Sequence, residues 1–300
     1  MQRLSGRTLS RGLSLACVLA LGAPVAAQAT NKYDDYRQQC DGRAFYATDD
    51  KGNLLKFREG SATRIEKQRA ITGLPAGVSL KGIDFRPATG DLYGLGSDAR
   101  IYRVSTRTAI ACAEGSTATC TDSAPLAGGL RGMSFGFDFN PMVDRIRITS
   151  EANQNLRANP NNGALAFTDP DLQFGPGSGV TGDPNVVGSA YRNSSFSAML
   201  KLTTELYAVD SKQDLLLTQN PPNAGTLVEP LKLGVDVADD LGFDIAGSSD
   251  QGYIATNAGG SRSATLYKVD LETGSTQSVS RIGNKGGVRI TGLAAVQDQQ

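Results

Sequence analysis

The sequence predicts an all-β fold, a five-bladed β-propeller with about four strands per blade, in which the N- and C-terminal segments pair to close the ring. Three observations support this prediction. A Gly-x-Asp-x segment recurs about every 53 residues, short strand-like runs alternate with turn signals, and the chain ends inside a repeat whose remainder is found at its beginning. No part of the mature chain keeps a convincing helical period.

The repeat is clearest in three aspartates, Asp84, Asp138 and Asp244, which are separated by 54 and then 106 residues. Because 106 is twice 53, a further copy is expected near residue 191, where Ala190 takes the place of the aspartate. The five copies are Gly82-Ile83-Asp84-Phe85, Gly136-Phe137-Asp138-Phe139, Gly188-Ser189-Ala190-Tyr191, Gly242-Phe243-Asp244-Ile245 and Gly292-Leu293-Ala294-Ala295. The innermost strand of a propeller blade lines the central channel, and we expect these segments to be the innermost strands.

Two further sets of residues follow the copies at nearly constant distances. The first set is mostly tyrosine: Tyr46, Tyr93, Arg147, Tyr207 and Tyr253. The second lies about ten residues later and is mostly basic: Lys56, Arg103, Arg157, Leu217 and Lys268. We expect the tyrosines to pack between blades with their hydroxyl groups at a polar rim, and the basic side chains to be solvated. The first member of each set precedes the first full copy, so one blade is split between the chain ends and its closure leaves no open edge.

Each unit holds short runs of β-forming residues bounded by turn signals such as Pro160-Asn161-Asn162-Gly163. The clearest runs are Asp91–Leu95, Arg100–Val104, Arg145–Thr149 and Thr265–Val269. A repeat of roughly 40 to 50 residues with four such runs is typical of a propeller blade. We therefore expect one propeller domain over residues 43–296, a lead-in over 30–42 and a short tail over 297–300.

Residues 1–29 are predicted to be a Sec-type bacterial signal peptide. Three arginines give a basic start, Leu13–Leu21 is apolar but too short to span a bilayer, and Ala27-Gln28-Ala29 is a small-x-small cleavage site. Cleavage leaves 27 basic and 30 acidic residues, and no second apolar stretch is long enough to cross a membrane. We expect a periplasmic or secreted protein with no stable membrane insertion.

The composition excludes several kinds of chemistry. The chain has 30 basic and 30 acidic residues and contains no histidine. A Ser-His-Asp triad, a Cys-His pair and a His-ligated zinc ion are therefore excluded. The balanced charge gives no support to a nucleic-acid partner, and we expect a monomer.

The mature chain keeps three cysteines, Cys40, Cys112 and Cys120. In an oxidising compartment we expect a disulfide between Cys112 and Cys120, because the small, polar spacer between them can close a loop. Pairings through Cys40 stay open, since three cysteines allow three single bridges.

Asp84, Asp138 and Asp244 are candidate ligand-binding residues because their positions on the innermost strands would let them face one another. A ring of carboxylates would bind a hard cation such as calcium, or raise a carboxyl pKa by mutual repulsion. Alternatively, each aspartate accepts hydrogen bonds from backbone N–H groups at the blade corner. We favour this second role because structural hydrogen bonding is the commoner fate of a recurring buried polar group.

Arg145 and Arg147 are also candidates, because Arg147 stands where the four other blades place tyrosine. The run alternates arginine with isoleucine, so if Ile146 and Ile148 face one neighbouring blade, the two arginines face the other. A guanidinium group there needs carboxylates or carbonyl groups around it. We favour structural ion pairing over an anion or ligand site.

Several long segments of the sequence resemble the bacterial family named domain of unknown function 4394. They are Phe135–Ile148, Gln154–Pro160, Gly82–Leu95 and Leu233–Asp236. The resemblance covers most of residues 43–296 and implies an exported, propeller-like repeat domain without an established activity or catalytic residues. The segment from Cys112 to Cys120 looks like an insertion relative to the family pattern.

Two functions from different classes follow from these observations. The first is a binding or scaffold module, in which a rigid ring presents loops to a ligand or to an extracytoplasmic protein. The alternative is a calcium-dependent hydrolase or lactonase, in which channel carboxylates hold an ion that polarises a carbonyl group. That enzyme needs a base, which in a chain without histidine must be a carboxylate, lysine or tyrosine. We favour binding and assign no catalytic residue and no cofactor.

Overall fold

A computed structural model of the chain describes residues 42–116, 120, 122–194, 203–247, 249–284 and 286–297. The predicted signal peptide and Cys40 lie outside the described residues. From Arg43 onward the chain belongs to one structural unit, and nearly all of its regular structure is β-strand.

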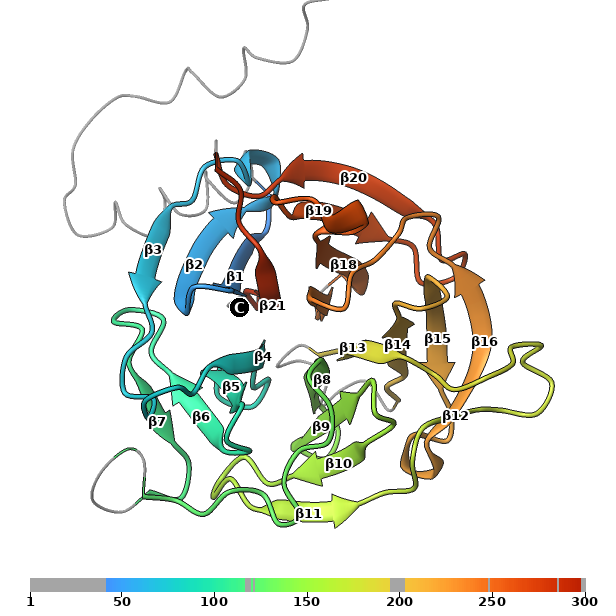
Figure 1. The fold of residues 1–300 in the computed structure, drawn as a ribbon, viewed down its shortest axis with the longest axis horizontal. Coiled ribbons are helices and arrows are strands. Elements are labelled where there is room, and N and C mark those ends of the chain that lie inside the picture. The colour runs from blue at the N-terminus through green and yellow to red at the C-terminus, as the bar shows by residue number, and fades with distance from the viewer. Residues whose placement is uncertain are drawn as a thin grey trace, which may run out of the picture. The chain divides into compact units, whose positions relative to one another are not determined.

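Five sheets form a ring of blades (Figure 1). Blade 1 contains β21 (Ile290–Ala295), β1 (Ala44–Asp49), β2 (Asn53–Arg58) and β3 (Lys67–Ala70). Blade 2 contains β4 (Leu80–Phe85), β5 (Leu92–Gly96), β6 (Ile101–Val104) and β7 (Ala111–Ala113). Blade 3 contains β8 (Phe135–Asn140), β9 (Arg145–Ser150), β10 (Asn155–Ala158) and β11 (Leu165–Thr168).

Blade 4 contains β13 (Val186–Tyr191), β14 (Leu206–Asp210), β15 (Leu215–Gln219), β16 (Thr226–Lys232) and β12 (Gln173–Phe174). Blade 5 contains β17 (Leu241–Ala246), β18 (Gln251–Thr256), β19 (Thr265–Val269) and β20 (Thr276–Arg281). Short 3₁₀ turns in the described part of the chain are η1 (Glu59–Ser61), η3 (Pro222–Ala224) and η4 (Ala258–Gly260). The fold is therefore the predicted five-bladed propeller, and blade 4 gains a fifth strand because β12 pairs in parallel with β16.

The ring is closed by β21, the last strand of the chain. It pairs antiparallel with β1, with Phe45 opposite Ala295 and Tyr46 opposite Ala294. The Val296 N–H group extends this ladder by donating to the Ala44 carbonyl oxygen at 2.9 Å. Blade 1 is thus built from both ends of the propeller, as the split repeat predicts.

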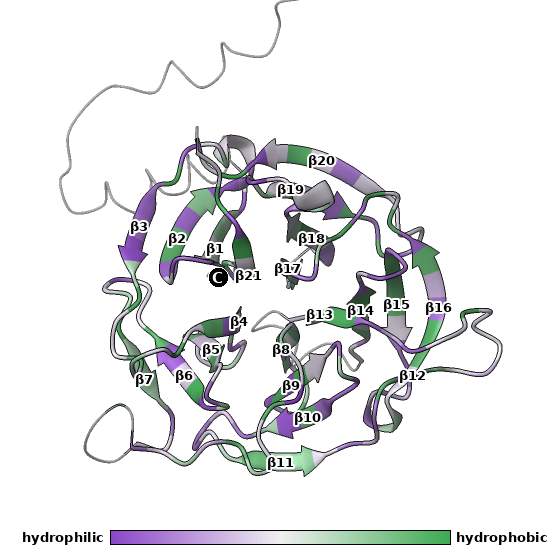
Figure 2. Ribbon diagram, in the orientation of Figure 1, coloured by the Kyte–Doolittle hydropathy of each residue, from purple (hydrophilic) through white to green (hydrophobic). Residues whose placement is uncertain are grey.

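All five Gly-x-Asp-x copies lie on innermost strands, namely β4, β8, β13, β17 and β21, and each of these strands contacts its two neighbours around the ring. Their residues are almost entirely buried, since both faces are covered by adjoining blades. By contrast, all four residues of the outer strand β3 are exposed, and this strand is hydrophilic in Figure 2. Charged side chains on such an outer edge discourage pairing with another chain.

Neighbouring blades are held together by apolar side chains. Phe45 of blade 1 meets Tyr253 of blade 5 edge-on, with ring centroids 4.9 Å apart. Tyr93 of blade 2 meets Phe139 of blade 3 in the same way at 5.3 Å. Burying one such side chain stabilises the fold by about 1.5–3 kcal/mol. The tyrosines of the repeat therefore pack between blades, as expected.

The predicted disulfide between Cys112 and Cys120 is present and closes a loop that begins at β7. Within the described ranges, no helix is both long and apolar enough to cross a membrane.

Candidate functional site

Antiparallel pairing explains the constant spacing of the repeat. Each tyrosine-set residue lies directly opposite the third residue of its Gly-x-Asp-x copy, as Tyr93 lies opposite Asp84 and Arg147 opposite Asp138. The basic set then lies opposite the tyrosine set on the next strand, with one exception. Leu217 pairs with Ala208, and Thr218 is the partner of Tyr207. The expected position of Leu217 is therefore wrong by one residue, because the β14–β15 hairpin holds one more residue between the paired positions Tyr207 and Thr218 than the β5–β6 hairpin holds between Tyr93 and Arg103.

The basic set is also ion-paired rather than freely solvated. Each long basic side chain has an acidic partner: Lys56 with Glu66, Arg103 with Glu114, Arg157 with Asp169 and Lys268 with Glu59. The tyrosine hydroxyl groups do reach this polar rim, since Tyr253 donates to Glu59 at 3.1 Å and Tyr207 donates to Glu205 at 3.2 Å. The repeat predicted the positions of the basic side chains but not those of their acidic partners, because the acidic residues lie at irregular distances along the chain.

The repeated glycine exists because neighbouring innermost strands nearly touch. A Cβ atom on Gly136 would lie 2.6 Å from the Ser189 nitrogen, and one on Gly242 would lie 2.5 Å from the Leu293 nitrogen. Backbone atoms cannot move aside as a flexible side-chain end can. Only glycine lets five strands meet around so narrow an axis.

We expect Gly136→Ala to lower the free energy of unfolding by about 1–3 kcal/mol, because the added methyl group overpacks a backbone contact. Gly188→Ala is the matched control in the same repeat position, since the atoms nearest to its Cβ atom would be side-chain atoms of Leu241 and Phe243, both at 3.0 Å. Urea unfolding of both variants measures the difference. Equal costs at the two positions would contradict the assignment of backbone crowding.

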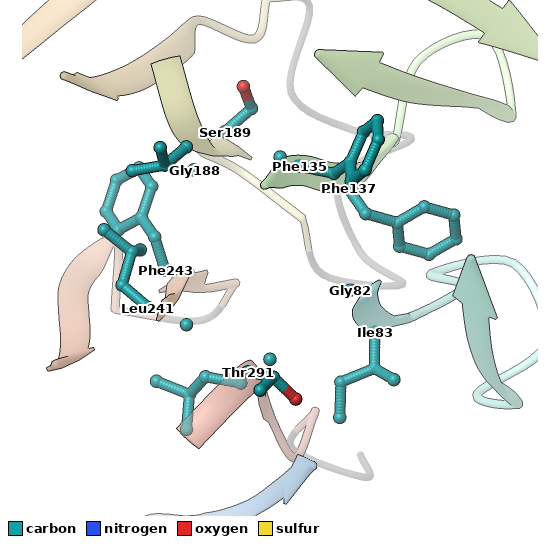
Figure 3. Close-up of a pocket in the computed structure, with 14 residues that line it drawn as sticks. Gly82, Ile83, Phe135, Phe137, Gly188, Ser189, Leu241, Phe243 and Thr291 are labelled. Carbon is teal, nitrogen blue, oxygen red and sulfur yellow. The ribbon is translucent and has the colours of Figure 1, made fainter. Parts of the chain in front are cut away.

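The channel along the axis is consequently very narrow. It is lined by residues of all five innermost strands, which surround the axis in Figure 3. The cavity between them measures about 10 Å³, which is room for about one water molecule. No substrate-sized molecule fits in this part of the channel.

The three aspartates of the repeat converge in the ring. Asp84, Asp138 and Asp244 are all buried, and one carboxylate oxygen of each lies within 4.8 Å of the others. Each also accepts a backbone N–H from the next blade. The donors are Phe139 to Asp84 at 2.9 Å, Tyr191 to Asp138 at 3.0 Å, and Ala295 to Asp244 at 2.6 Å. The carboxylates therefore converge, and each also accepts a backbone hydrogen bond that links two blades.

Burial is the main reason why these carboxyl groups hold their protons tightly. Desolvation raises the pKa of Asp84 and Asp138 well above the usual range, and repulsion from the neighbouring aspartates adds to it. Desolvation also raises the pKa of Asp244 to about 7, against the opposing effect of its backbone donors and of Arg43. At neutral pH the cluster therefore retains protons.

The donor set only partly fits calcium. Carboxylate oxygens are suitable ligands, but three aspartates supply three convergent oxygens, and calcium takes six to eight. One end of the channel is further closed by the C-terminal segment, where the Gln297 amide donates to the carbonyl oxygens of Phe85 and Ser194, both at 3.2 Å. The cluster is better suited to sharing protons and joining blades than to activating a substrate.

Arg147 is fully buried in an ion-pair network between blades 3 and 4. Its guanidinium group donates to Asp169 and Asn155 in blade 3, both at 2.7 Å. It also donates to Asn223 at 2.7 Å and to the Tyr191 hydroxyl at 3.4 Å, both in blade 4. The isoleucines of β9 pack toward blade 2, as the alternation predicts. The guanidinium group therefore bridges blades 3 and 4, with two partners in each.

Arg145 does not join this network. Its side chain donates to the carbonyl oxygens of Val143 and Asp144 in the adjacent turn, at 3.4 and 2.9 Å. Sequence reasoning missed a second bridge between blades, in which Arg86 contacts Asp144 and also donates to Asn161 at 2.7 Å. Asp144 directly precedes the arginine–isoleucine run, but no repeat set includes Arg86.

A polar cavity lies away from the repeat positions. We name it the seam pocket, because it lies beside the β1–β21 closure, and its walls include Asp50, Lys51, Arg64, Ile65, Asn284 and Val288. Its volume is about 320 Å³, which is within the range of small-molecule sites. Sequence reasoning missed it because its residues come from loops with no internal periodicity.

Comparisons with solved structures return several similar chains of low identity. A protein from Lactobacillus plantarum is 16% identical over 85% of this chain and 72% of its own, with a TM-score of 0.41. A protein of unknown function from Bacteroides thetaiotaomicron is 12% identical over 78% of this chain and 56% of its own, with a TM-score of 0.47. A structure of YCF48 bound to a D1 peptide is 10% identical over 83% of this chain and 77% of its own, with a TM-score of 0.38.

A search of curated proteins returns no match. A family model described as a domain of unknown function, DUF4394, matches residues 53–294, which is most of the propeller. The match spans more than half of the chain, and the chain therefore belongs to the DUF4394 family.

Proposed function

We propose that this protein is an exported binding module, periplasmic or secreted, in which a rigid propeller presents loops to a ligand. The observation that carries the proposal is the narrow channel. The glycine of each repeat copy lets the five innermost strands approach the axis closely, and the cavity between them holds about one water molecule. A channel this narrow has no room for a substrate, so the ring is better suited to a structural role than to catalysis. Recognition then falls to the loops around it.

The charge and the N-terminal pattern support the same role. The basic start, short apolar stretch and small-x-small site favour export, and the mature chain carries a small negative charge without a basic surface. The disulfide between Cys112 and Cys120 is compatible with an oxidising compartment.

The test combines binding and turnover on one purified protein. We expect a saturable rise in melting temperature with at least one class of small polar molecule, and no turnover of ester or lactone substrates in millimolar calcium. Turnover that requires calcium and is lost in Asp138→Asn would overturn the proposal in favour of a hydrolase.

A calcium titration separates the two functions further. If the aspartate cluster held calcium, millimolar calcium would raise the melting temperature of the wild-type protein but not of the Asp84→Asn, Asp138→Asn double variant. We expect no shift that depends on these two residues, because they supply too few ligands for the ion. Thermal unfolding with and without calcium measures this directly.

A further inference from the structure

We propose that the seam pocket binds a small amino dicarboxylate, a molecule with two carboxylate groups and one ammonium group. This inference rests on the proposed binding function and names a ligand class and a site for it. The pocket, its volume of about 320 Å³ and its charged groups carry the argument.

Three elements form the walls of the pocket. The β1–β2 turn carries Asp50 and Lys51, the segment after η1 carries Arg64 and Ile65, and the loop between β20 and β21 carries Asn284. A ligand here would contact both the first hairpin of blade 1 and the loop that leads into its closing strand.

The walls are held in place before any ligand arrives. One carboxylate oxygen of Asp49 accepts the Lys51 N–H at 3.0 Å and the Asn53 N–H at 2.7 Å, which fixes the turn. The Asp50 N–H donates to the Arg289 carbonyl oxygen at 3.1 Å, and the Gly283 N–H donates to the Ala62 carbonyl oxygen at 2.9 Å. Fixed walls reduce the conformational entropy that binding would otherwise cost.

The charges of the pocket remain available for a ligand. Within the described part of the chain, Asp50, Lys51 and Arg64 form no ion pair and their side chains make no hydrogen bond, whereas Asp49 is used by the turn. Two cations and the Asp50 carboxylate therefore face a shared space, and the Asp49 carboxylate in the same wall is already hydrogen-bonded within the turn. A ligand of complementary charge carries two carboxylates and one ammonium group, and the planar guanidinium of Arg64 suits bidentate recognition of one carboxylate.

The floor of the pocket is apolar. Ile65 and Val288 are partly buried and pack against the core cluster of blades 1 and 5. Such a floor accommodates the short methylene chain that separates the two carboxylates, and it excludes water from one side of the ionic contacts. A rigid apolar base with a few polar groups at the rim is the usual form of a small-molecule site.

The experiment is isothermal titration calorimetry of the purified protein with L-glutamate, succinate and L-glutamine at constant ionic strength. We expect L-glutamate to bind most tightly. Succinate lacks the ammonium group that would donate a hydrogen bond to Asp50, and L-glutamine lacks the second carboxylate. Arg64→Gln should weaken L-glutamate binding about tenfold or more, since a charge-assisted contact is lost. Arg69→Gln, on the exposed strand β3 outside the pocket, is the matched control and should leave binding unchanged.

A second variant tests the orientation of the ligand. Asp50→Asn should abolish the preference for L-glutamate over succinate while both still depend on Arg64. Absence of saturable binding by all three probes, or L-glutamate binding that survives Arg64→Gln, would overturn the ligand class. If the ligand class is overturned, saturable binding of an uncharged sugar would still support the proposed binding function. Turnover of an ester or lactone would overturn both the ligand class and the binding function.

Discussion

Replacing Arg147 by methionine is expected to lower the free energy of unfolding by about 3–5 kcal/mol. Methionine keeps an unbranched side chain but removes every guanidinium donor from a buried site. Asp169 then loses one of its two arginine partners, and the side-chain oxygens of Asn155 and Asn223 lose the hydrogen bonds that Arg147 donates to them. Urea unfolding at pH 7 with linear extrapolation measures the change.

The matched control for this variant is Arg157→Met. Arg157 pairs with the same Asp169, but its side chain is 21% exposed where that of Arg147 is 2% exposed. Water replaces part of the lost interaction at Arg157, so we expect a clearly smaller cost. If the two variants were equally stable, the network at Arg147 would not be what joins blades 3 and 4.

The second large effect concerns pH. We expect the protein to lose stability as the pH rises through about 7, by about 4 kcal/mol from Asp244 alone, because burial raises the pKa of that carboxyl from 3.8 to about 7. A carboxyl with a raised folded-state pKa binds its proton more tightly in the native than in the unfolded chain. This contribution is therefore fully present below the unfolded pKa and lost above the folded one. Urea unfolding between pH 4 and 8 in a chelating buffer measures it, because the loss is spread over the range between the unfolded and folded pKa values.

Asp138→Asn is expected to reduce this pH dependence and to stabilise the protein at pH 8. The amide oxygen of asparagine can still accept the Tyr191 N–H, while repulsion with Asp84 and Asp244 disappears. Asp270→Asn is the control, because Asp270 is exposed and its backbone donors lower its pKa, so its effect lies on the acid side. Identical pH profiles for wild type and Asp138→Asn would contradict a shared proton cluster.

Much of the fold was predictable because propeller closure imposes regular spacing. Gly136 and Gly242 repeat since adjacent strands approach too closely for any side chain, and Asp84 and Asp138 repeat since each binds the next blade. The glycine occurs in all five copies and the aspartate in three, always at the same place, so both appear as periodic residue types. The pairing of β1 with β21 followed from the same arithmetic.

Other parts of the candidate site have no periodic signal. Asp169 is the acidic partner of Arg147, and Glu59 is that of Lys268. These two acidic residues come from different positions within their blades. The seam pocket is built from turns, whose lengths vary without disturbing the ring. The misplacement of Leu217 has the same origin, because a hairpin that is longer by one residue shifts the register of the following strand.

The closing strand also sets the order of events during protein synthesis. Phe45 and its partner Ala295 are 250 residues apart, so the first hairpin to leave the ribosome waits for almost the last residues to be translated. Until then β1 exposes an unpaired edge that invites association with other chains. A premature stop codon before Ile290 would therefore yield an open, aggregation-prone ring, even though such a truncated chain would still contain four complete blades.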